Sequence, residues 1–589
     1  MKSTILLLLF ISASILSNAQ APVIQWQKCF GGSSNETAYD IRQTSDGGFI
    51  VAGGSESNDG NVSGNHGLMD FWVIKINETG HIQWQKSLGG DTTDFALAIR
   101  QTTDGGYIVT GCSLSNDGEI TGNHGYFDYW VVKLNDTGAI QWQKSLGGDT
   151  LDYASAIKQT TDGGYIVSGY SVSNNGNISG NHGGYDYWIV KLNDTGAIQW
   201  QKSLGGSNSD KATAIQQTAD GGYIVAGTSQ SNDGDVTVNH GGVDYWIVKL
   251  NGTGVIQWQK SLGGSNYDEA TAIQQTSDGG YIIAGQSNSN DGDVSGNHGS
   301  FDYWIVKIND TGAIQWQKSI GGSSVDWAYS IQQTTDGGYV VAGSSYSNNG
   351  DVTGNHGSFD YWIVKLNDTG AIQWQKSLGG SLQDNATSIQ QTTDGAYIIG
   401  GVSYSNDGDV TASHGNGDFW IVKLTCIVNP GIITGDSIIC KGRNMVLTDT
   451  VSGGVWHLAN SNASISGGII TGLVAGNDTA FYTVTNESCV STATIAFPFK
   501  VILCPSEVNQ LSGASENSII PNPTTGLISI SGITHPQIKI YNPLGQLIIS
   551  AANTNTISIR EFPAGLYFIR VFNEQGDLLK QENVVKVQE

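Results

Sequence analysis

Hydrophobic and polar residues alternate along much of the chain with a period of two, which is the spacing of one face of a β-strand. Within residues 154–206, the segments 154–160, 165–169 and 197–203 follow this pattern, and a fourth segment at 186–192 is apolar almost throughout. Gly-, Asn- and Asp-rich turns separate the segments. Since no stretch has the 3.6-residue period of a helix, the pattern predicts four antiparallel strands.

This four-strand unit repeats without insertion. The motif Ile-Gln-Trp-Gln-Lys recurs every 58 residues, with its tryptophan at Trp26, Trp84, Trp142, Trp200, Trp258, Trp316 and Trp374. Four antiparallel strands per unit are typical of a propeller blade. The array begins at Val23 with a fourth strand and ends at Leu424 with a third, so the first strand completes the last blade if the ring closes. We therefore predict an all-β, seven-bladed β-propeller over residues 22–424.

The regularly placed tryptophans have two interpretations. One recurs in the third strand, as Trp188, and one in the fourth, as Trp200. Residues at alternating strand positions usually face a core, so we expect these rings to fill the wedges between blades. The alternative is that exposed rings stack on carbohydrate.

The N-terminal segment and the charge point to an exported protein. Residues 1–19 contain Lys2, an apolar run and a final Ser-Asn-Ala, which predicts a signal peptide. No later segment has the roughly 18 apolar residues of a membrane helix, so we expect no membrane span. The net charge of −25 disfavours nucleic acid and anionic membranes as partners, because phosphate contacts need Lys and Arg. We expect a secreted protein.

The most polar recurring feature is the loop between the second and third strands, which reads Ser-Asn-Asp-Gly-Asp in several repeats. Oxygen-bearing side chains around a Gly turn are typical of calcium loops, so the calcium candidates are Asp233, Asp235, Asp291 and Asp293. The alternative is a turn whose side chains bond their own backbone, and Asn177 in place of an Asp favours it. We assign no metal ligand and expect no cofactor.

Two other polar residues recur once per repeat. A His ends each loop, for example His240, and is expected to cap the loop or pack on the next blade. An Asp follows each Gly-Gly pair from the second repeat onward, for example Asp210, just before the innermost strand. These carboxylates either ring a channel mouth and attract cations, or accept backbone N–H groups and hold the loop. We favour the second role.

We find no catalytic residues. The sequence lacks a Gly-x-Ser-x-Gly elbow, a His-Glu-x-x-His motif and a phosphate-binding loop. The departures from the repeat that we note are Lys211, Glu269, Trp327, Gln230 and Tyr404, and they are single and scattered along the sequence. An active site needs several convergent differences, so we expect a protein that is not an enzyme.

The composition changes after the repeats. Residues 426–504 contain four cysteines, which an oxidising compartment allows to pair. Three connectivities are possible, and we favour Cys440–Cys489 with Cys426–Cys504. The sequences at 435–440, 453–456, 470–476 and 482–489 resemble those of bacterial immunoglobulin-like modules. This resemblance implies a β-sandwich that acts as a spacer.

Residues 505–518 have the composition of a linker, and residues 519–589 form the last predicted domain. Three motifs occur there in order, Pro-Asn-Pro-Thr-Thr-Gly at 521–526, Ile-Lys-Ile-Tyr-Asn-Pro-Leu-Gly at 538–545 and Pro-Ala-Gly-Leu-Tyr-Phe-Ile-Arg-Val at 563–571. Together they resemble the type A C-terminal sorting domain of the type IX secretion system of Bacteroidetes. The resemblance implies a small β-sandwich that engages the secretion machinery. It also implies release of the protein or its attachment to the outer cell surface.

These observations predict a secreted or cell-surface binding or adhesion protein. Seven similar sets of loops would meet a polymeric ligand such as a glycan or matrix, with affinity raised by multivalency. One alternative is a propeller hydrolase or lyase that acts on polysaccharide. Another is a purely structural surface protein.

Overall fold

The computed structural model describes residues 21–425, 430–486, 491–504 and 518–587. They belong to two compact units, residues 1–502 and residues 503–589. Every regular element in the described ranges is a β-strand, as the period-two pattern predicts. The predicted signal peptide at 1–19, and all but the last residue of the predicted linker at 505–518, lie outside the described residues.

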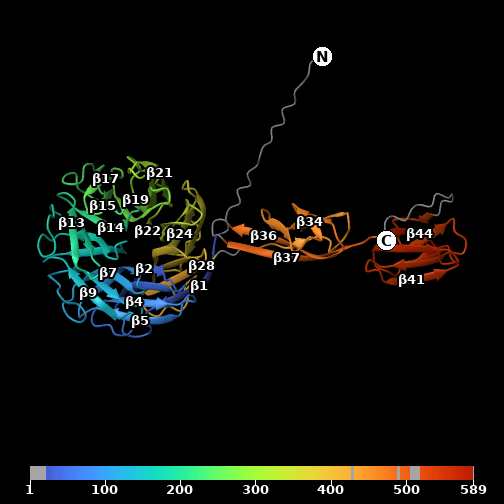
Figure 1. The fold of residues 1–589 in the computed structure, drawn as a ribbon, viewed down its shortest axis with the longest axis horizontal. Helices are drawn as coiled ribbons and strands as arrows, with labels where there is room; N and C mark the ends of the chain where they lie inside the picture. Colours follow the sequence, from blue (N-terminus) through green and yellow to red (C-terminus); the bar gives the residue numbers. More distant parts are fainter. Residues whose placement is uncertain (1–20, 426–429, 487–490, 505–517, 588–589) are drawn as a thin grey trace, which may run out of the picture. The chain divides into compact units, whose positions relative to one another are not determined.

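Seven four-stranded antiparallel sheets surround a central axis and confirm the predicted propeller (Figure 1). The inner (first) strands of blades 1 to 6 are β2 (Glu36–Gln43), β6 (Asp94–Gln101), β10 (Asp152–Gln159), β14 (Asp210–Gln217), β18 (Asp268–Gln275) and β22 (Asp326–Gln333). The second strands are β3 (Phe49–Ser55), β7 (Tyr107–Ser113), β11 (Tyr165–Ser171), β15 (Tyr223–Ser229), β19 (Tyr281–Ser287) and β23 (Tyr339–Ser345). The third strands are β4 (Asp70–Ile76), β8 (Asp128–Leu134), β12 (Asp186–Leu192), β16 (Asp244–Leu250), β20 (Asp302–Ile308) and β24 (Asp360–Leu366). The outer (fourth) strands are β5 (Ile82–Leu88), β9 (Ile140–Leu146), β13 (Ile198–Leu204), β17 (Ile256–Leu262), β21 (Ile314–Ile320) and β25 (Ile372–Leu378).

Blade 7 is built from both ends of the repeat array. From inside to outside it contains β26 (Asp384–Gln391), β27 (Tyr397–Ser403), β28 (Asp418–Thr425) and β1 (Val23–Phe30). β1 pairs antiparallel with β28, from Val23 opposite Thr425 to Phe30 opposite Phe419. The orphan strand at the N-terminal end of the array thus completes the last blade, as the offset of strand types predicts, and the closed ring leaves no blade incomplete.

The third-strand tryptophans are core residues, as predicted. All seven are fully buried, and in five seams a third-strand Tyr packs on the Trp of the next blade and donates its hydroxyl to that residue's carbonyl. Tyr245 lies 2.9 Å from the Trp304 oxygen in this way. The fourth-strand tryptophans are half-buried, except for buried Trp374, because the outer strand has one edge in solvent.

Two polar contacts recur in all seven blades. The last Gln of each inner strand accepts an N–H from the first turn of the preceding blade, and Thr393 closes this ring by donating to Gln43 at 2.9 Å. Within each blade a buried third-strand lysine pairs with an Asp of the first turn, as Lys249 does with Asp220 at 2.8 Å. Because the contacts recur, the stability of the ring is spread over equivalent seams.

Three small sheets follow the propeller in sequence. Their strand orders are β30-β37-β36-β33, β31-β35-β34 and β29-β32. The bounds are β29 (Ile433–Thr434), β30 (Ile438–Cys440), β31 (Asn444–Val446), β32 (Thr448–Asp449), β33 (Val455–Leu458), β34 (Ala463–Ser466), β35 (Ile469–Gly472), β36 (Gly476–Asn486) and β37 (Ser491–Ile502). Trp456 packs on Tyr482 beside a core that includes Ile470 and Val501. The immunoglobulin-like assignment stays a prediction.

The cysteines divide by environment. Cys29 and Cys112 are buried free thiols in the propeller, as expected for small apolar residues. Cys440 and Cys504 are each disulfide-bonded. Cys426 and Cys489 lie outside the described residues, so the predicted pairing stays a prediction.

The C-terminal unit contains two sheets, with strand orders β38-β39-β42 and β41-β40-β43-β44. The bounds are β38 (Ser518–Ile520), β39 (Leu527–Ser531), β40 (Gln537–Tyr541), β41 (Leu547–Ala552), β42 (Thr556–Ser558), β43 (Gly565–Phe572) and β44 (Leu578–Lys586). Alternate residues such as Ile538, Ile540 and Ile569 are fully buried and form its core. The predicted β-rich domain is therefore present, and its core follows the period of two.

Candidate ligand-binding sites of the propeller

The candidate calcium loops bond to neighbouring backbone. Asp233 Oδ1 accepts the Ser207 N–H at 2.7 Å, and Asp235 Oδ2 accepts the Gly205 N–H at 3.2 Å. Asp291 and Asp293 repeat these contacts in the next blade. In the part of the chain that the structure describes, no group of three or more His, Cys, Asp or Glu side chains is placed to hold a metal ion. These Asp side chains therefore bind the segment that links the preceding blade to their own, and not their own turn as the alternative predicts. The contacts give the calcium interpretation no support.

The recurring His and Asp residues are structural. His240 Nδ1 lies 2.7 Å from Asp244 Oδ2, so the His caps the start of the third strand of its own blade. Asp210 is fully buried and accepts hydrogen bonds from Gly206 N–H and the Ser231 hydroxyl, both at 2.8 Å. The predicted role of this Asp in holding the loop is confirmed. The alternative, a carboxylate ring open to the channel mouth, is wrong because the side chains are buried.

Comparison of the seven repeats, column by column, separates an invariant framework from a few variable positions. Ile-Gln-Trp-Gln-Lys is the same in every repeat, whereas three columns contain seven different residues each. Each inner strand begins with an Asp or, in blade 1, with Glu36. The three variable columns are the residue before this acid, the residue after it, and the sixth residue of the second strand. They contain Asn35, Thr93, Leu151, Ser209, Tyr267, Val325 and Gln383; Thr37, Phe95, Tyr153, Lys211, Glu269, Trp327 and Asn385; and Gly54, Cys112, Tyr170, Thr228, Gln286, Ser344 and Val402.

The sheet register gathers these columns at one end of the central channel, which we name the variable mouth. Tyr153 lies directly opposite Tyr170, and the same register holds in each blade. The residue after each second strand also varies, and it donates its N–H to the first variable column, as Gln230 does to Ser209 O. The expectation of scattered departures is therefore wrong. All of them lie at this mouth: Lys211, Glu269, Trp327, Gln230 and Tyr404.

Several aromatic side chains lie at the variable mouth. Tyr153 stacks on Tyr170 with ring centroids 4.9 Å apart, and Trp327 stacks on Phe359 at 5.1 Å. Tyr346, which packs against Phe359, is 50% exposed. Because these rings are only partly buried, packing of the propeller core does not account for them. Sequence reasoning missed this cluster, although the column-by-column comparison of repeats would have revealed it.

The mouth also contains two opposite charges on adjacent blades. The Lys211 ammonium lies 4.6 Å from the ring centroid of Tyr185 and 5.2 Å from that of Tyr170. Glu269 accepts a hydrogen bond from Gln286 Nε2 at 2.7 Å and one from the Tyr267 hydroxyl at 3.2 Å. Burial raises the pKa of Glu269, and these two hydrogen bonds oppose the effect. Glu56, which follows the second strand of blade 1, is a second acid and accepts a hydrogen bond from Asn35 Nδ2 at 2.9 Å. These side chains therefore have a small net negative charge.

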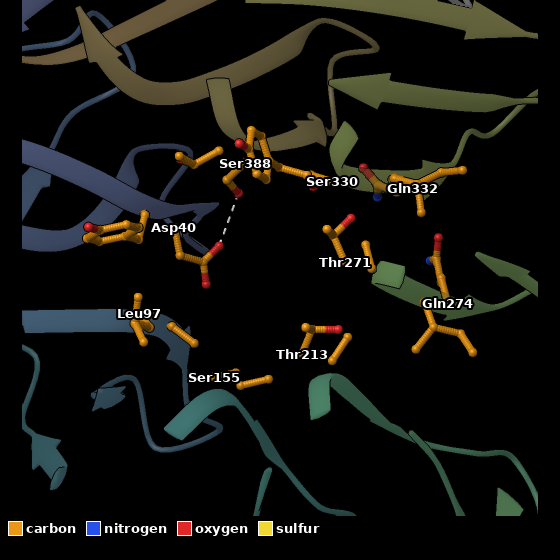
Figure 2. Close-up of a pocket in the computed structure, with 18 of the residues that line it drawn as sticks. Asp40, Leu97, Ser155, Thr213, Thr271, Gln274, Ser330, Gln332 and Ser388 are labelled. Atoms are coloured by element: carbon orange, nitrogen blue, oxygen red, sulfur yellow. Dashed lines mark hydrogen bonds between the residues drawn. The ribbon is translucent and has the colours of Figure 1, made fainter. Parts of the chain in front are cut away.

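The central channel contains two cavities, which are separated by a ring of seven residues. This waist consists of one residue per inner strand and lines both cavities: Tyr39, Leu97, Ser155, Thr213, Thr271, Tyr329 and Thr387. The cavity beside the variable mouth has a volume of about 450 Å³ and the other has about 430 Å³. Figure 2 shows side chains from all seven blades pointing into the second cavity. The Thr213 hydroxyl donates to Ala270 O of the next blade, which holds the waist in place.

Shallower grooves recur on the outer rim, between neighbouring blades. One is lined by His66, Lys86 and Glu119, and an equivalent groove contains His298 and Asp351. His66 Nε2 lies 3.6 Å from Glu119 Oε1. Equivalent residues line these two grooves, whereas the residues of the variable mouth differ at every blade.

Comparison with known families places the C-terminal unit. Residues 518–586 match the family model of the secretion system C-terminal sorting domain, which confirms the resemblance that the three motifs indicate. The chain thus contains a type IX secretion system sorting domain, which indicates a secreted protein of a kind often attached to the cell surface, and an interaction with that secretion system. None of the curated proteins matches the chain.

Several solved structures are similar in part. The WD40 domain of Pan2 from Neurospora crassa is 10% identical, with 67% of this chain and 90% of that chain covered, at a TM-score of 0.37. The extracellular domain of the putative hybrid two-component system BT4673 from B. thetaiotaomicron is 11% identical, with 96% and 60% covered, at 0.37. PorZ, a surface component of the type IX secretion system of Porphyromonas gingivalis, is 11% identical, with 97% and 86% covered, at 0.24. The propeller fold is defined by this chain's own strand pairing.

This chain is therefore a secreted propeller protein with a type IX sorting domain. In the described ranges, no helix has the length and apolar character needed to cross a membrane.

Proposed function

We propose that this secreted protein is a binding protein rather than an enzyme, and that it holds its ligand at the variable mouth of the propeller. The proposal is supported mainly by the contrast between repeat positions that are identical in all seven blades and positions that differ in every blade. Seven repeats keep the same framework motif, yet differ completely at three positions that meet at one end of the channel.

Structural need does not explain this contrast. The variable inner-strand residues, such as Tyr153, Lys211 and Trp327, are only partly buried, whereas the fully buried positions on either side hold the repeat residues Asp and Ala. A ligand that contacts several blades at once would meet a different side chain on each. The variable mouth therefore suits one asymmetric ligand, bound on a rigid framework in the way that variable loops bind on an antibody.

The side chains at the mouth favour a weakly charged polymer, and we propose a glycan. Stacked pairs such as Trp327 with Phe359 offer flat apolar faces, and the mouth also contains polar groups such as the Tyr267 hydroxyl and the Glu269 carboxylate. Sugars combine apolar faces with hydroxyl groups, so they match both features. Binding of a protein matrix component is the other outcome of the test.

The test is binding of the full-length protein to glycan and matrix arrays, with substitutions that copy other repeats. Trp327→Asn introduces the residue found at Asn385, and Tyr153→Thr the residue found at Thr37, so the framework should tolerate both. We expect each to weaken binding about tenfold or more, as loss of a central aromatic contact does. The control is Val255→Ala, an exposed apolar residue of the turn between the third and fourth strands.

The array results distinguish a binding site at the variable mouth from one in the outer grooves and from a purely structural protein. Glycan binding that both mouth variants weaken and the control does not supports the proposal. Binding that neither variant changes would move the site to the repeated outer grooves, and binding to no array component would leave a structural surface protein. The same arrays in calcium and in a chelator test the loops of Asp233 and Asp291, where chelator-sensitive binding would restore the calcium interpretation.

A further inference from the structure

The second cavity of the channel, beyond the waist from the variable mouth, contains an asymmetric cluster of positive charge. One inner-strand column projects into it, and this column reads Arg42, Arg100, Lys158, Gln216, Gln274, Gln332 and Gln390 from blade 1 to blade 7. The three cations occupy three consecutive blades. They therefore share one side of the cavity, and amides occupy the other.

One carboxylate faces these three cations. Among the described residues that line this cavity, Asp40 is the only acid. Asp40 Oδ1 lies 2.9 Å from Arg42 Nη2, and Asp40 Oδ2 bonds Arg100 Nη1 and accepts the Ile99 N–H at 3.0 Å. The Ser388 hydroxyl also donates to Asp40, at 3.1 Å (Figure 2). The acid is thus fully engaged, and the cluster keeps a net charge of about +2 when every group is ionised.

This excess is unusual in a protein with a net charge of −25. Every buried third-strand lysine has its own Asp partner, as Lys365 has Asp336 at 2.8 Å. The Lys158 ammonium, in contrast, forms no hydrogen bond or ion pair with any residue in the described part of the chain. Burial and the nearby charges of Arg100 and Arg42 hold the pKa of Lys158 well below its ordinary value.

The amides on the other side add donors to the cavity. Gln274 Oε1 accepts the backbone N–H of Gln333 at 2.6 Å, and Gln216, Gln332 and Gln390 make the same contact with their own neighbours. Each carbonyl oxygen is therefore used in a seam between blades, and the NH₂ group is left as the polar group for the cavity. The guanidinium, ammonium and amide N–H groups that line this cavity are all donors, and the one carboxylate among its described lining residues is already bound by Arg42 and Arg100.

We propose that this cavity binds an oxyanion group, a carboxylate, sulfate or phosphate, between Arg42, Arg100 and Lys158 on one side and the Gln amides on the other. Arginine and lysine donors match the oxygens of these groups. The volume of about 430 Å³ accommodates either a free inorganic anion or the acidic group of a larger molecule. The proposal does not depend on a ligand at the variable mouth.

The test is isothermal titration calorimetry of the full-length protein with sodium sulfate and, separately, sodium glucuronate, against sodium chloride at equal ionic strength. Sulfate binding alone indicates a free inorganic anion, and glucuronate binding indicates the carboxylate of a larger ligand. Lys158→Gln is the main variant, because it copies the residue of four other blades and removes no partner of Asp40. We expect it to weaken binding about tenfold or more, the effect of losing one charge-assisted hydrogen bond.

Two further variants complete the test. Asp40→Ser with Arg42→Gln, Arg100→Gln and Lys158→Gln gives every blade a Gln at this position and copies Ser388 in place of the acid, and we expect no binding. Lys260→Gln removes the same charge from an exposed outer-strand position and should leave binding unchanged. If neither salt binds the native protein more tightly than chloride does, or if the all-Gln variant binds equally well, the proposal is wrong.

Discussion

Tyr245→Phe tests how neighbouring blades hold together. The Tyr245 hydroxyl is buried and donates to Trp304 O of the next blade at 2.9 Å, while its ring packs on the Trp304 indole. The substitution removes the hydroxyl and keeps the ring. Nature has made the same change in this chain at Phe71 and Phe419, which pack on the Trp of the next blade without a hydroxyl. The fold therefore tolerates the change.

The expected cost follows from that one hydrogen bond. A buried hydrogen bond contributes about 1 kcal/mol net, and an acceptor left without its partner raises the cost to about 2 kcal/mol. Unfolding entropy is about 2 cal/mol/K per residue, so for a propeller of roughly 400 residues 1 kcal/mol lowers the unfolding midpoint by about 1 °C. Replacing all five tyrosines lowers it by about 5–10 °C if the seams act independently. The five residues are Tyr129, Tyr187, Tyr245, Tyr303 and Tyr361.

A second substitution should restore part of the loss. At the seam where Phe71 lacks the hydroxyl, Thr110 of the second strand donates to Trp130 O at 3.2 Å instead. Ala284 is the equivalent of Thr110 beside Trp304. We therefore expect Ala284→Thr to recover stability in the Tyr245→Phe background and not in the native one. Differential scanning calorimetry measures all four proteins. The reasoning would be refuted by an unchanged midpoint in the five-fold variant.

Three further predictions concern acid, thiols and ring closure. Burial raises the pKa of Asp152 to about 6, so protonation of this group stabilises the folded state as pH falls from above 6 to about 4. Burial also acts on Asp104, but hydrogen bonds from Thr102 and Lys133 outweigh it and hold the pKa of Asp104 at about 2. The stabilisation from Asp104 is therefore lost as pH falls from about 4 to 2. Midpoints measured from pH 8 to 2 should therefore peak near pH 4, and a steady fall from pH 7 would contradict this. Burial, then Asp418 and Asp384, raise the pKa of Cys29 to about 12, so iodoacetamide at pH 8 should label it only after unfolding, as mass spectrometry would show. Deleting β1 exposes the edge of β28 and should abolish the cooperative propeller transition, whereas a retained transition would show that the ring does not need its closing strand.

The fold was largely predictable because each repeat carries a complete local signal. The segment 186–192 is a strand with the same bounds as predicted, since its apolar run is bounded by polar turns. The inner strand starts two residues earlier than predicted, at Asp152, because that residue pairs with Ser171 across the sheet. The sorting domain could also be recognised from the sequence, since its three motifs occur in order and residues 518–586 match the family.

The candidate sites were much less predictable. Lys211, Glu269 and Trp327 are 58 residues apart, and in the sequence each is a single departure from the repeat. The sequence alone determined the repeat, the strand types and the closing offset of β1 and β28, because these depend on local alternation and on counting strands. The predicted ring already implied a common channel, but only the tertiary structure decided which variable positions face it and which of its two cavities each one lines. Closure of the ring brings equivalent positions of all seven blades to one axis, so single substitutions such as Arg42, Arg100 and Lys158 become one site.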